Sequence, residues 1–120
     1  MAPKILIADD EVHLARILQL TLERAGYETI VAYDGEEALK KTREEHPELV
    51  ILDLMLPLLD GYKVCRRLKC DEGTKSIPVI ILSARDLSRA ELDEPMMADL
   101  FMEKPFNSTV LLERISNLLK

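Results

Sequence analysis

Short apolar runs recur along this chain, and a reactive polar side chain follows each of them. Three of the runs are continuously apolar, a pattern typical of strands that are covered on both faces. The four runs are Lys4 to Ala8, Leu49 to Leu52, Pro78 to Leu82 and Leu100 to Glu103. They predict an open parallel sheet, in which ligands bind outside the carboxyl ends of the strands.

Segments with helical periodicity separate these runs. The apolar stripe of Leu14, Ile17, Leu18 and Leu22 predicts a helix from Glu11 to Arg24. The other predicted elements are a short strand from Glu28 to Tyr33, a helix from Glu36 to His46, a helix after Asp60-Gly61 that buries Tyr62, Cys65 and Leu68, and a last helix from Asn107 to Lys120.

One further helix is expected from Asp86 to Met97, although Pro95 would disrupt it near its end. With this helix, five strands alternate with five helices along the chain. Such alternation predicts an α/β fold built as a three-layer sandwich. The 120 residues, 48% of them hydrophobic, correspond to one domain with one core, so we expect a single domain over residues 1–120.

Composition narrows the classes of partner. The formal net charge of -6, with Lys and Arg spread along the chain, argues against direct binding of nucleic acid, which needs a basic face. No apolar run approaches the ~20 residues that span a bilayer, so we expect no membrane contact and a cytoplasmic location. Cys65 and Cys70 lack a redox or zinc spacing, and we expect them to be reduced thiols.

The polar residues that follow the runs are Asp9, Asp10, Asp53, Ser83 and Lys104. In a parallel sheet they meet at one edge. Carboxylate oxygens on neighbouring strand ends suit Mg²⁺ or Mn²⁺. Without a cation, the mutual repulsion of the carboxylates should raise the pKa of one of them, or Lys104 should lie close enough to compensate. Beside a metal and a lysine, one carboxylate can attack a phosphoryl group.

These residues resemble the receiver domain of two-component response regulators, a family that includes the chemotaxis receiver. The resemblance covers essentially the whole chain. It rests on Asp9-Asp10-Glu11, on Asp53 followed by Pro57 and Asp60-Gly61, on Ser83-Ala84, and on Lys104-Pro105-Phe106. It implies a doubly wound, flavodoxin-like fold with five parallel strands in the order 2-1-3-4-5.

The resemblance also implies the chemistry. Asp53 would be the phosphoacceptor, in a Mg²⁺-dependent reaction in which the domain catalyses much of its own phosphotransfer and dephosphorylation. Asp10 and Asp53 would bind the metal through their side chains, Asp9 through water, and Met55 through its backbone carbonyl. Lys104 would pair with the acceptor and then with the phosphoryl oxygens. The Lys104-Pro105 peptide would be cis.

The resemblance also implies residues for a conformational switch and for the lifetime of the phosphorylated state. After phosphorylation, Ser83 would move inward and Phe101 would rotate. These movements would change the face made by the fourth helix, the fifth strand and the fifth helix. Met55 and Arg85 would flank the path of the hydrolytic water. Because Met55 cannot orient water by hydrogen bonding, we expect slow self-dephosphorylation.

The implied partners are a sensor histidine kinase or histidine phosphotransfer protein, and an output domain or target protein. Residues Asp93 to Leu100 depart from the family pattern, since a turn glycine is missing and Pro95 lies ahead. This departure leaves output through the fourth helix, and dimerisation on phosphorylation, open. It leaves the site chemistry untouched.

Two alternatives belong to other classes. An aspartyl-phosphate hydrolase of the haloacid dehalogenase type also uses a strand-end Asp, but it needs a second acid two residues on, where this chain has Met55. A receiver-like interaction module that acts without phosphorylation would carry a broken site, and these motifs are intact.

Overall fold

The structure is a computed structural model that describes residues 2–84 and 97–120. Within these residues, five parallel strands form one sheet in the order β2-β1-β3-β4-β5, as predicted. The strands are β1 (Lys4–Ala8), β2 (Glu28–Ala32), β3 (Leu49–Asp53), β4 (Val79–Ser83) and β5 (Leu100–Glu103). The order reverses beside β1, so the carboxyl ends of β1 and β3 border the crevice where doubly wound sheets bind ligands.

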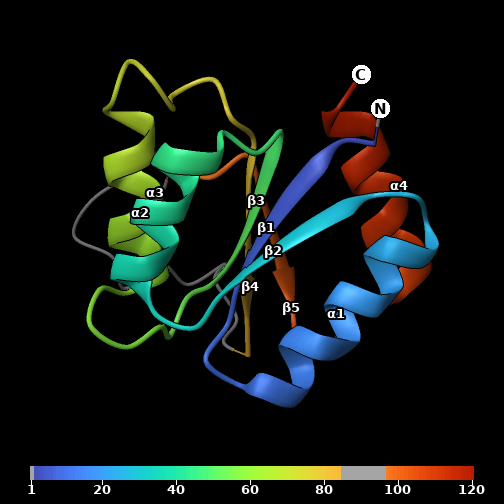
Figure 1. The fold of residues 1–120 in the computed structure, drawn as a ribbon. Helices are drawn as coiled ribbons and strands as arrows, with labels where there is room; N and C mark the ends of the chain where they lie inside the picture. Colours follow the sequence, from blue (N-terminus) through green and yellow to red (C-terminus); the bar gives the residue numbers. More distant parts are fainter. Residues whose placement is uncertain (1, 85–96) are drawn as a thin grey trace.

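The described helices are α1 (Val12–Arg24), α2 (Gly35–Glu45), α3 (Gly61–Lys69) and α4 (Ser108–Leu118). Figure 1 shows α2 and α3 on one face of the sheet and α1 and α4 on the other. The three-layer sandwich is therefore confirmed. The helix predicted from Asp86 to Met97 falls almost wholly on residues 85–96, which lie outside the described residues, so four helices are seen where five were expected.

Alternation along the buried strands divides the core in two. Leu6, Val50 and Ile81 face the cluster that α2 and α3 cover, and their neighbours Ile7, Ile51 and Ile80 face the cluster that α1 and α4 cover. Every residue of β3 and β4 is buried, which is why these strands read as continuous apolar runs.

Side-chain caps set where several helices begin. Asp34 accepts a hydrogen bond from the backbone N–H of Glu37, Asp60 from that of Lys63, and Asn107 from that of Val110. These contacts satisfy N–H groups that a first turn leaves without partners. At the other end of α2, His46 adopts the left-handed conformation with φ 48°, which ends the helix before Pro47.

The apolar stripe that predicted α1 is only partly buried. Ile17 is 55% exposed, whereas Ala15, Leu18 and Leu22 form the buried face of α1. The apolar stripe of this helix is wider than the surface that the sheet and α4 cover, and Ile17 lies at its outer margin.

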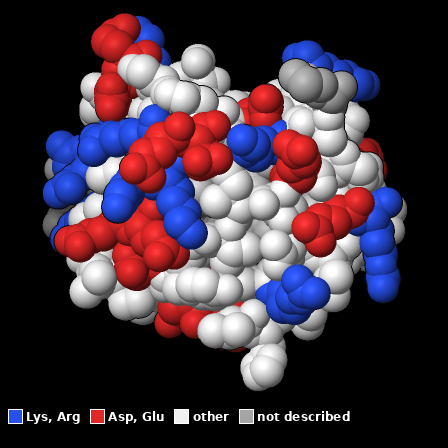
Figure 2. Space-filling model, viewed as in Figure 1, with Lys and Arg blue, Asp and Glu red and all other residues white. Residues whose placement is uncertain are grey.

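Surface charge is uneven. Figure 2 shows acidic and basic side chains interspersed over the side that carries α2, and a largely uncharged stretch across the middle of the same face. No helix among the described residues is long and apolar enough to cross a bilayer.

Candidate functional site

Strand register brings the acidic residues together. Ala8 at the end of β1 pairs with Leu52 of β3, so the next residues along each strand, Asp9 and Asp53, are neighbours at the carboxyl edge of the sheet. Asp10 follows directly in the turn that leads into α1. Among the described residues, carboxylate oxygens of Asp9, Asp10 and Asp53 lie within 4.8 Å of one another.

The three carboxylates differ in exposure. Asp9 and Asp53 are 1% and 6% exposed, whereas Asp10 faces solvent. Backbone donors hold the buried pair: Glu11 N–H donates to Asp9 Oδ1 (2.9 Å), and Met55 N–H donates to Asp53 Oδ1 (3.2 Å). Their Oδ1 atoms are thus engaged with the backbone, and their Oδ2 atoms face a cation.

That cation is Lys104. Its Nζ lies 3.1 Å from Asp9 Oδ2 and 3.2 Å from Asp53 Oδ2, so one ammonium bridges two carboxylates. Backbone pairing positions it, because Lys104 N–H donates to the carbonyl of Ser83 at the end of β4 (2.8 Å). The Lys104-Pro105 peptide is cis, as predicted.

Both features expected of crowded carboxylates are present: a carboxyl group with a raised pKa and a nearby lysine. Burial raises the pKa of Asp9, the nearby Asp53 charge adds to this, and hydrogen bonds from Glu11 and Lys104 offset only part of it. Burial alone would lower the pKa of Lys104, but its hydrogen bond to Asp9 and the charge of Asp53 outweigh burial and raise it. The raised pKa of Lys104 favours its charged form. For Asp9, burial contributes more than the nearby like charge to the raised pKa.

The donor set fits a hard divalent cation. Carboxylate oxygens from three residues converge, and Asp10 is exposed to solvent. Magnesium prefers oxygen ligands and keeps several waters, so a site that is partly open suits it better than a closed cage.

Three of the remaining predicted residues lie within the described part of the chain. Ser83 is fully buried at the end of β4, and Phe101 on β5 is 40% exposed. Met55 is 62% exposed just past Asp53. Arg85 lies outside the described residues.

A groove of about 490 Å³ adjoins the cluster, and the sequence analysis missed it. Its lining includes Leu14 and Ile17 of α1, and Lys104, Pro105 and Phe106 from the segment that follows β5. Its signal was present in the sequence as the width of the α1 apolar stripe, which was used only to predict the helix.

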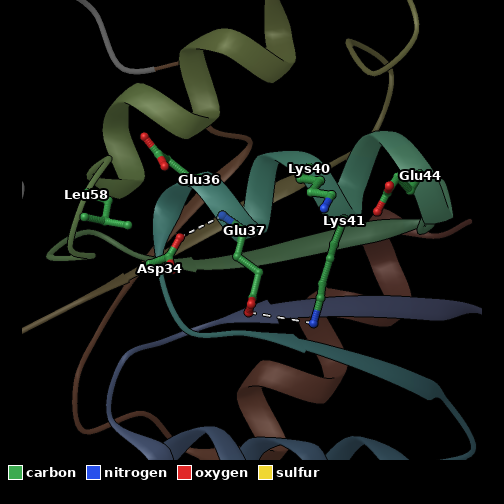
Figure 3. Close-up of a pocket in the computed structure, with 7 residues that line it drawn as sticks. All are labelled: Asp34, Glu36, Glu37, Lys40, Lys41, Glu44 and Leu58. Carbon is green, nitrogen blue, oxygen red and sulfur yellow. Dashed lines mark hydrogen bonds and ion pairs between the residues drawn. The ribbon is translucent and has the colours of Figure 1, made fainter.

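A second hollow lies over α2 and is lined by charged side chains and Leu58. Figure 3 shows two contacts among these side chains, one between Asp34 and Glu37 and one between Glu37 and Lys41. Asp34 caps the helix through Glu37 N–H (2.7 Å), and Lys41 Nζ lies 3.7 Å from Glu37 Oε1. Lys41 also donates to the carbonyl of Val31 on β2 (2.7 Å). We therefore assign this hollow a structural role.

Comparisons with known proteins agree with this geometry. The family model described as response regulator receiver domain matches residues 5–116. The alkaline phosphatase synthesis transcriptional regulatory protein PhoP of Bacillus subtilis is 42% identical over 124 residues, which covers 100% of this chain and 50% of that protein. The chain thus spans about half the length of the curated relatives it matches.

Solved structures show the same fold. A response regulator structure from Chloroflexus aurantiacus is 35% identical with a TM-score of 0.91, and the match covers 99% of this chain and 98% of that one. The response regulator TrrA of Thermotoga maritima, solved in complex with Mg²⁺ and BeF, is 35% identical with a TM-score of 0.88, over 99% of this chain and 100% of that one.

Proposed function

Since the chain belongs to the response regulator receiver domain family of two-component systems, we propose that it signals by accepting a phosphoryl group on Asp53. Receiver domains are signalling domains, and the donor here would be a sensor histidine kinase or a histidine phosphotransfer protein. The domain would catalyse much of this transfer, and the later hydrolysis, through its own side chains.

The observation that carries this proposal is the placement of Lys104 Nζ within 3.2 Å of both Asp9 and Asp53. A single ammonium held between the acceptor and a second carboxylate can move its interaction to phosphoryl oxygens as charge develops there. Because the pKa of Lys104 is raised, it would remain a cation throughout.

The transfer itself forms one bond and breaks one. A carboxylate oxygen of Asp53 attacks phosphorus in line with the leaving nitrogen of a phosphohistidine. The P–N bond breaks, its electron pair stays on the imidazole, and Asp53 becomes an acyl phosphate. The reaction exchanges a carboxylate of charge −1 for a phosphoryl group of charge near −2, so Lys104 contributes most after the transfer has begun.

Asp10 and Asp53 would hold Mg²⁺ directly, Asp9 would hold it through water, and the backbone carbonyl of Met55 would complete the protein ligands. Magnesium, when bound, would neutralise charge on the transferring oxygens. The oxygen cluster of this chain and the magnesium complex of TrrA support this assignment. We propose that Mn²⁺ substitutes, because the same oxygen ligands suit it.

We propose that Ser83 and Phe101 read the modification. Ser83 closes the buried strand β4 next to the cluster, so its hydroxyl would donate to a phosphoryl oxygen. Phe101, half exposed on β5, would then turn inward, and the surface around β5 and the C-terminal helix α4 would change. Met55 and Arg85 would set how fast water removes the phosphoryl group.

The signal would pass by protein contact to an output domain or a target protein. PhoP, of which this chain matches half, is a transcriptional regulatory protein, which makes an output domain that acts on transcription a natural candidate. The acidic balance of this domain assigns it no direct role in nucleic acid binding. The alternative is a receiver-like interaction module that never becomes phosphorylated.

The test is incubation with acetyl phosphate, with and without Mg²⁺, followed by intact mass. We expect the gain of one phosphoryl group, lost in Asp53→Asn and lost without Mg²⁺. A folded protein that binds Mg²⁺ but gains no mass under excess donor would establish the unphosphorylated module instead.

A further inference from the structure

Lys69, the last residue of α3, differs from its basic neighbours on that helix. Arg66 and Arg67 are exposed, whereas the Lys69 side chain is 12% exposed. Its Nζ donates to Asp99 Oδ2 at 2.7 Å and to the carbonyl of Ile77 at 2.8 Å. A buried ammonium with two short contacts is a fixed structural element.

Asp99 links this ammonium to the sheet. Its Oδ2 also accepts from Val79 N–H (2.8 Å), and its own N–H donates to the carbonyl of Val79 (2.9 Å). Asp99 directly precedes β5, and Val79 is the first residue of β4. Lys69 and Asp99 therefore join the end of α3 to the starts of β4 and β5, and we call these two residues the Lys69–Asp99 clamp.

The clamp sits at one end of β5, and Lys104 follows the other end. Between them, β5 pairs with β4 in a fixed register that runs from Ile80↔Leu100 to Ser83↔Glu103. The ladder ends where Lys104 N–H meets the Ser83 carbonyl. The position of Asp99 against Val79 thus sets which residue arrives beside Asp9 and Asp53.

We propose that Lys69 and Asp99 are positioning residues for Lys104, and thereby for the phosphotransfer. β5 needs such a restraint, because it is the last strand in the sheet order and alternates between half-buried and exposed, while every residue of β4 is buried. A weakly buried strand holds its register poorly. Displacement of a catalytic group by about 1 Å can cost on the order of 100-fold in rate. The proposal rests on the function proposed above.

The direct test is amide hydrogen exchange in Lys69→Met, which keeps most of the length of the side chain and removes its donors. We expect exchange at Leu100–Lys104 to quicken on the order of tenfold, with β1 and β3 unchanged. Lys75→Met is the matched control, because it removes the same charge from the exposed Lys75–Glu72 pair and leaves β5 alone.

The functional test compares phosphorylation by acetyl phosphate in the same variants. We expect Lys69→Met to slow it roughly 10- to 100-fold. Magnesium binding, followed by NMR titration, should be unchanged, since Asp53 ends β3 and Asp9 and Asp10 directly follow β1. In a Lys104→Ala background, adding Lys69→Met should change the rate less than about twofold, because the clamp acts through Lys104.

The outcomes separate cleanly. Unchanged exchange in β5, or an equal loss of rate with and without Lys104, overturns the clamp even if Asp53 is phosphorylated. If wild type gains no phosphoryl group, the proposed function fails. The hydrogen exchange of the Lys104 amide then tests by itself whether the clamp positions Lys104. Should Lys69→Met fail to fold, Asp99→Asn, which keeps an acceptor for Val79 N–H, is read by the same criteria.

Discussion

At the level of single residues, Asp9 is held in an environment that disfavours its charge. Burial is the main reason that its pKa is raised, and the neighbouring Asp53 adds to the effect. Since the folded-state pKa exceeds the unfolded value, the folded protein binds this proton more tightly than the unfolded chain does. The ionised carboxylate therefore costs stability at neutral pH, and a fall in pH through the raised pKa relieves this cost.

We predict that Asp9→Asn, a neutral isostere, raises the free energy of unfolding by roughly 1 kcal/mol at pH 7 without divalent cations. Urea unfolding across pH measures it. The advantage over wild type should shrink as pH falls through the raised pKa of Asp9, and the exposed Glu113→Gln is the control. An advantage that grows on acidification contradicts this account.

The two cysteines have opposite environments. Cys65 is buried, and burial raises the pKa of its thiol to about 11, whereas Cys70 is exposed. We expect iodoacetamide at pH 8 to alkylate Cys70 and to modify Cys65 at least about 100-fold more slowly, since the thiolate is the nucleophile and access requires opening. Peptide mass mapping over time measures both rates, and comparable rates would show that α3 opens readily.

Substitution of Met55 tests its proposed influence on the lifetime of the phosphorylated state. It is 62% exposed one residue beyond Asp53-Leu54, and its thioether cannot orient a water. We predict that Met55→Asn shortens the half-life of the phosphorylated protein several-fold, measured as loss of phosphoryl mass after donor removal. Met55→Leu is the apolar control, and a half-life in Met55→Asn no shorter than in wild type sinks the assignment.

At the level of elements, the start of α2 is packed against the loop that leads from β3 to α3. Gly35 N–H donates to the carbonyl of Pro57 (3.1 Å), and a Cβ on Gly35 would lie 1.6 Å from the carbonyl oxygen of Leu59. Backbone stands on both sides of this contact, so no side chain can move aside. The loop past Asp53 depends on it.

We predict that Gly35→Ala lowers the free energy of unfolding by roughly 2–3 kcal/mol or more. Thermal and urea unfolding measure the loss. Gly73→Ala is the matched control, because the nearest atom to a Cβ there lies at 3.6 Å, an ordinary contact. Equal stability of the two variants would mean that α2 and this loop can move apart at little cost in free energy.

At the level of the whole molecule, the cluster of Asp9, Asp10 and Asp53 concentrates repulsion at one edge of a chain whose net charge is already -6. A cation bound only by the folded state stabilises it by mass action. We predict that Mg²⁺ at ten times its Kd adds about 1.4 kcal/mol and raises the thermal midpoint by several degrees. Sodium chloride of equal ionic strength is the control.

Asp10→Asn should abolish most of this gain, because Asp10 is the exposed carboxylate of the cluster and a proposed direct ligand. If Mg²⁺ stabilises Asp10→Asn as much as wild type, the cation binds elsewhere. Differential scanning calorimetry, with both proteins at matched concentrations, decides between the two.

Prediction from the sequence succeeded where local pattern and fold agree. The apolar runs became β1, β3, β4 and β5, and the caps at Asp60 and Asn107 began helices as expected. It did not show that Ile17 would be exposed, because periodicity marks an apolar stripe without showing how much of its width a partner covers. The strand order came from family resemblance, since no local pattern encodes it.

Alternation, capping and turn residues are properties of neighbours along the chain, so the sequence alone was sufficient for the strands, most helix starts and the arrival of five reactive groups at one edge. Long-range contacts decided the rest: that Lys104 bridges Asp9 as well as Asp53, that burial outweighs like charge at Asp9, and that Lys69 reaches Asp99. Distance and desolvation between residues far apart in sequence exist only once the layers have packed, and these two quantities set the charge states of the site.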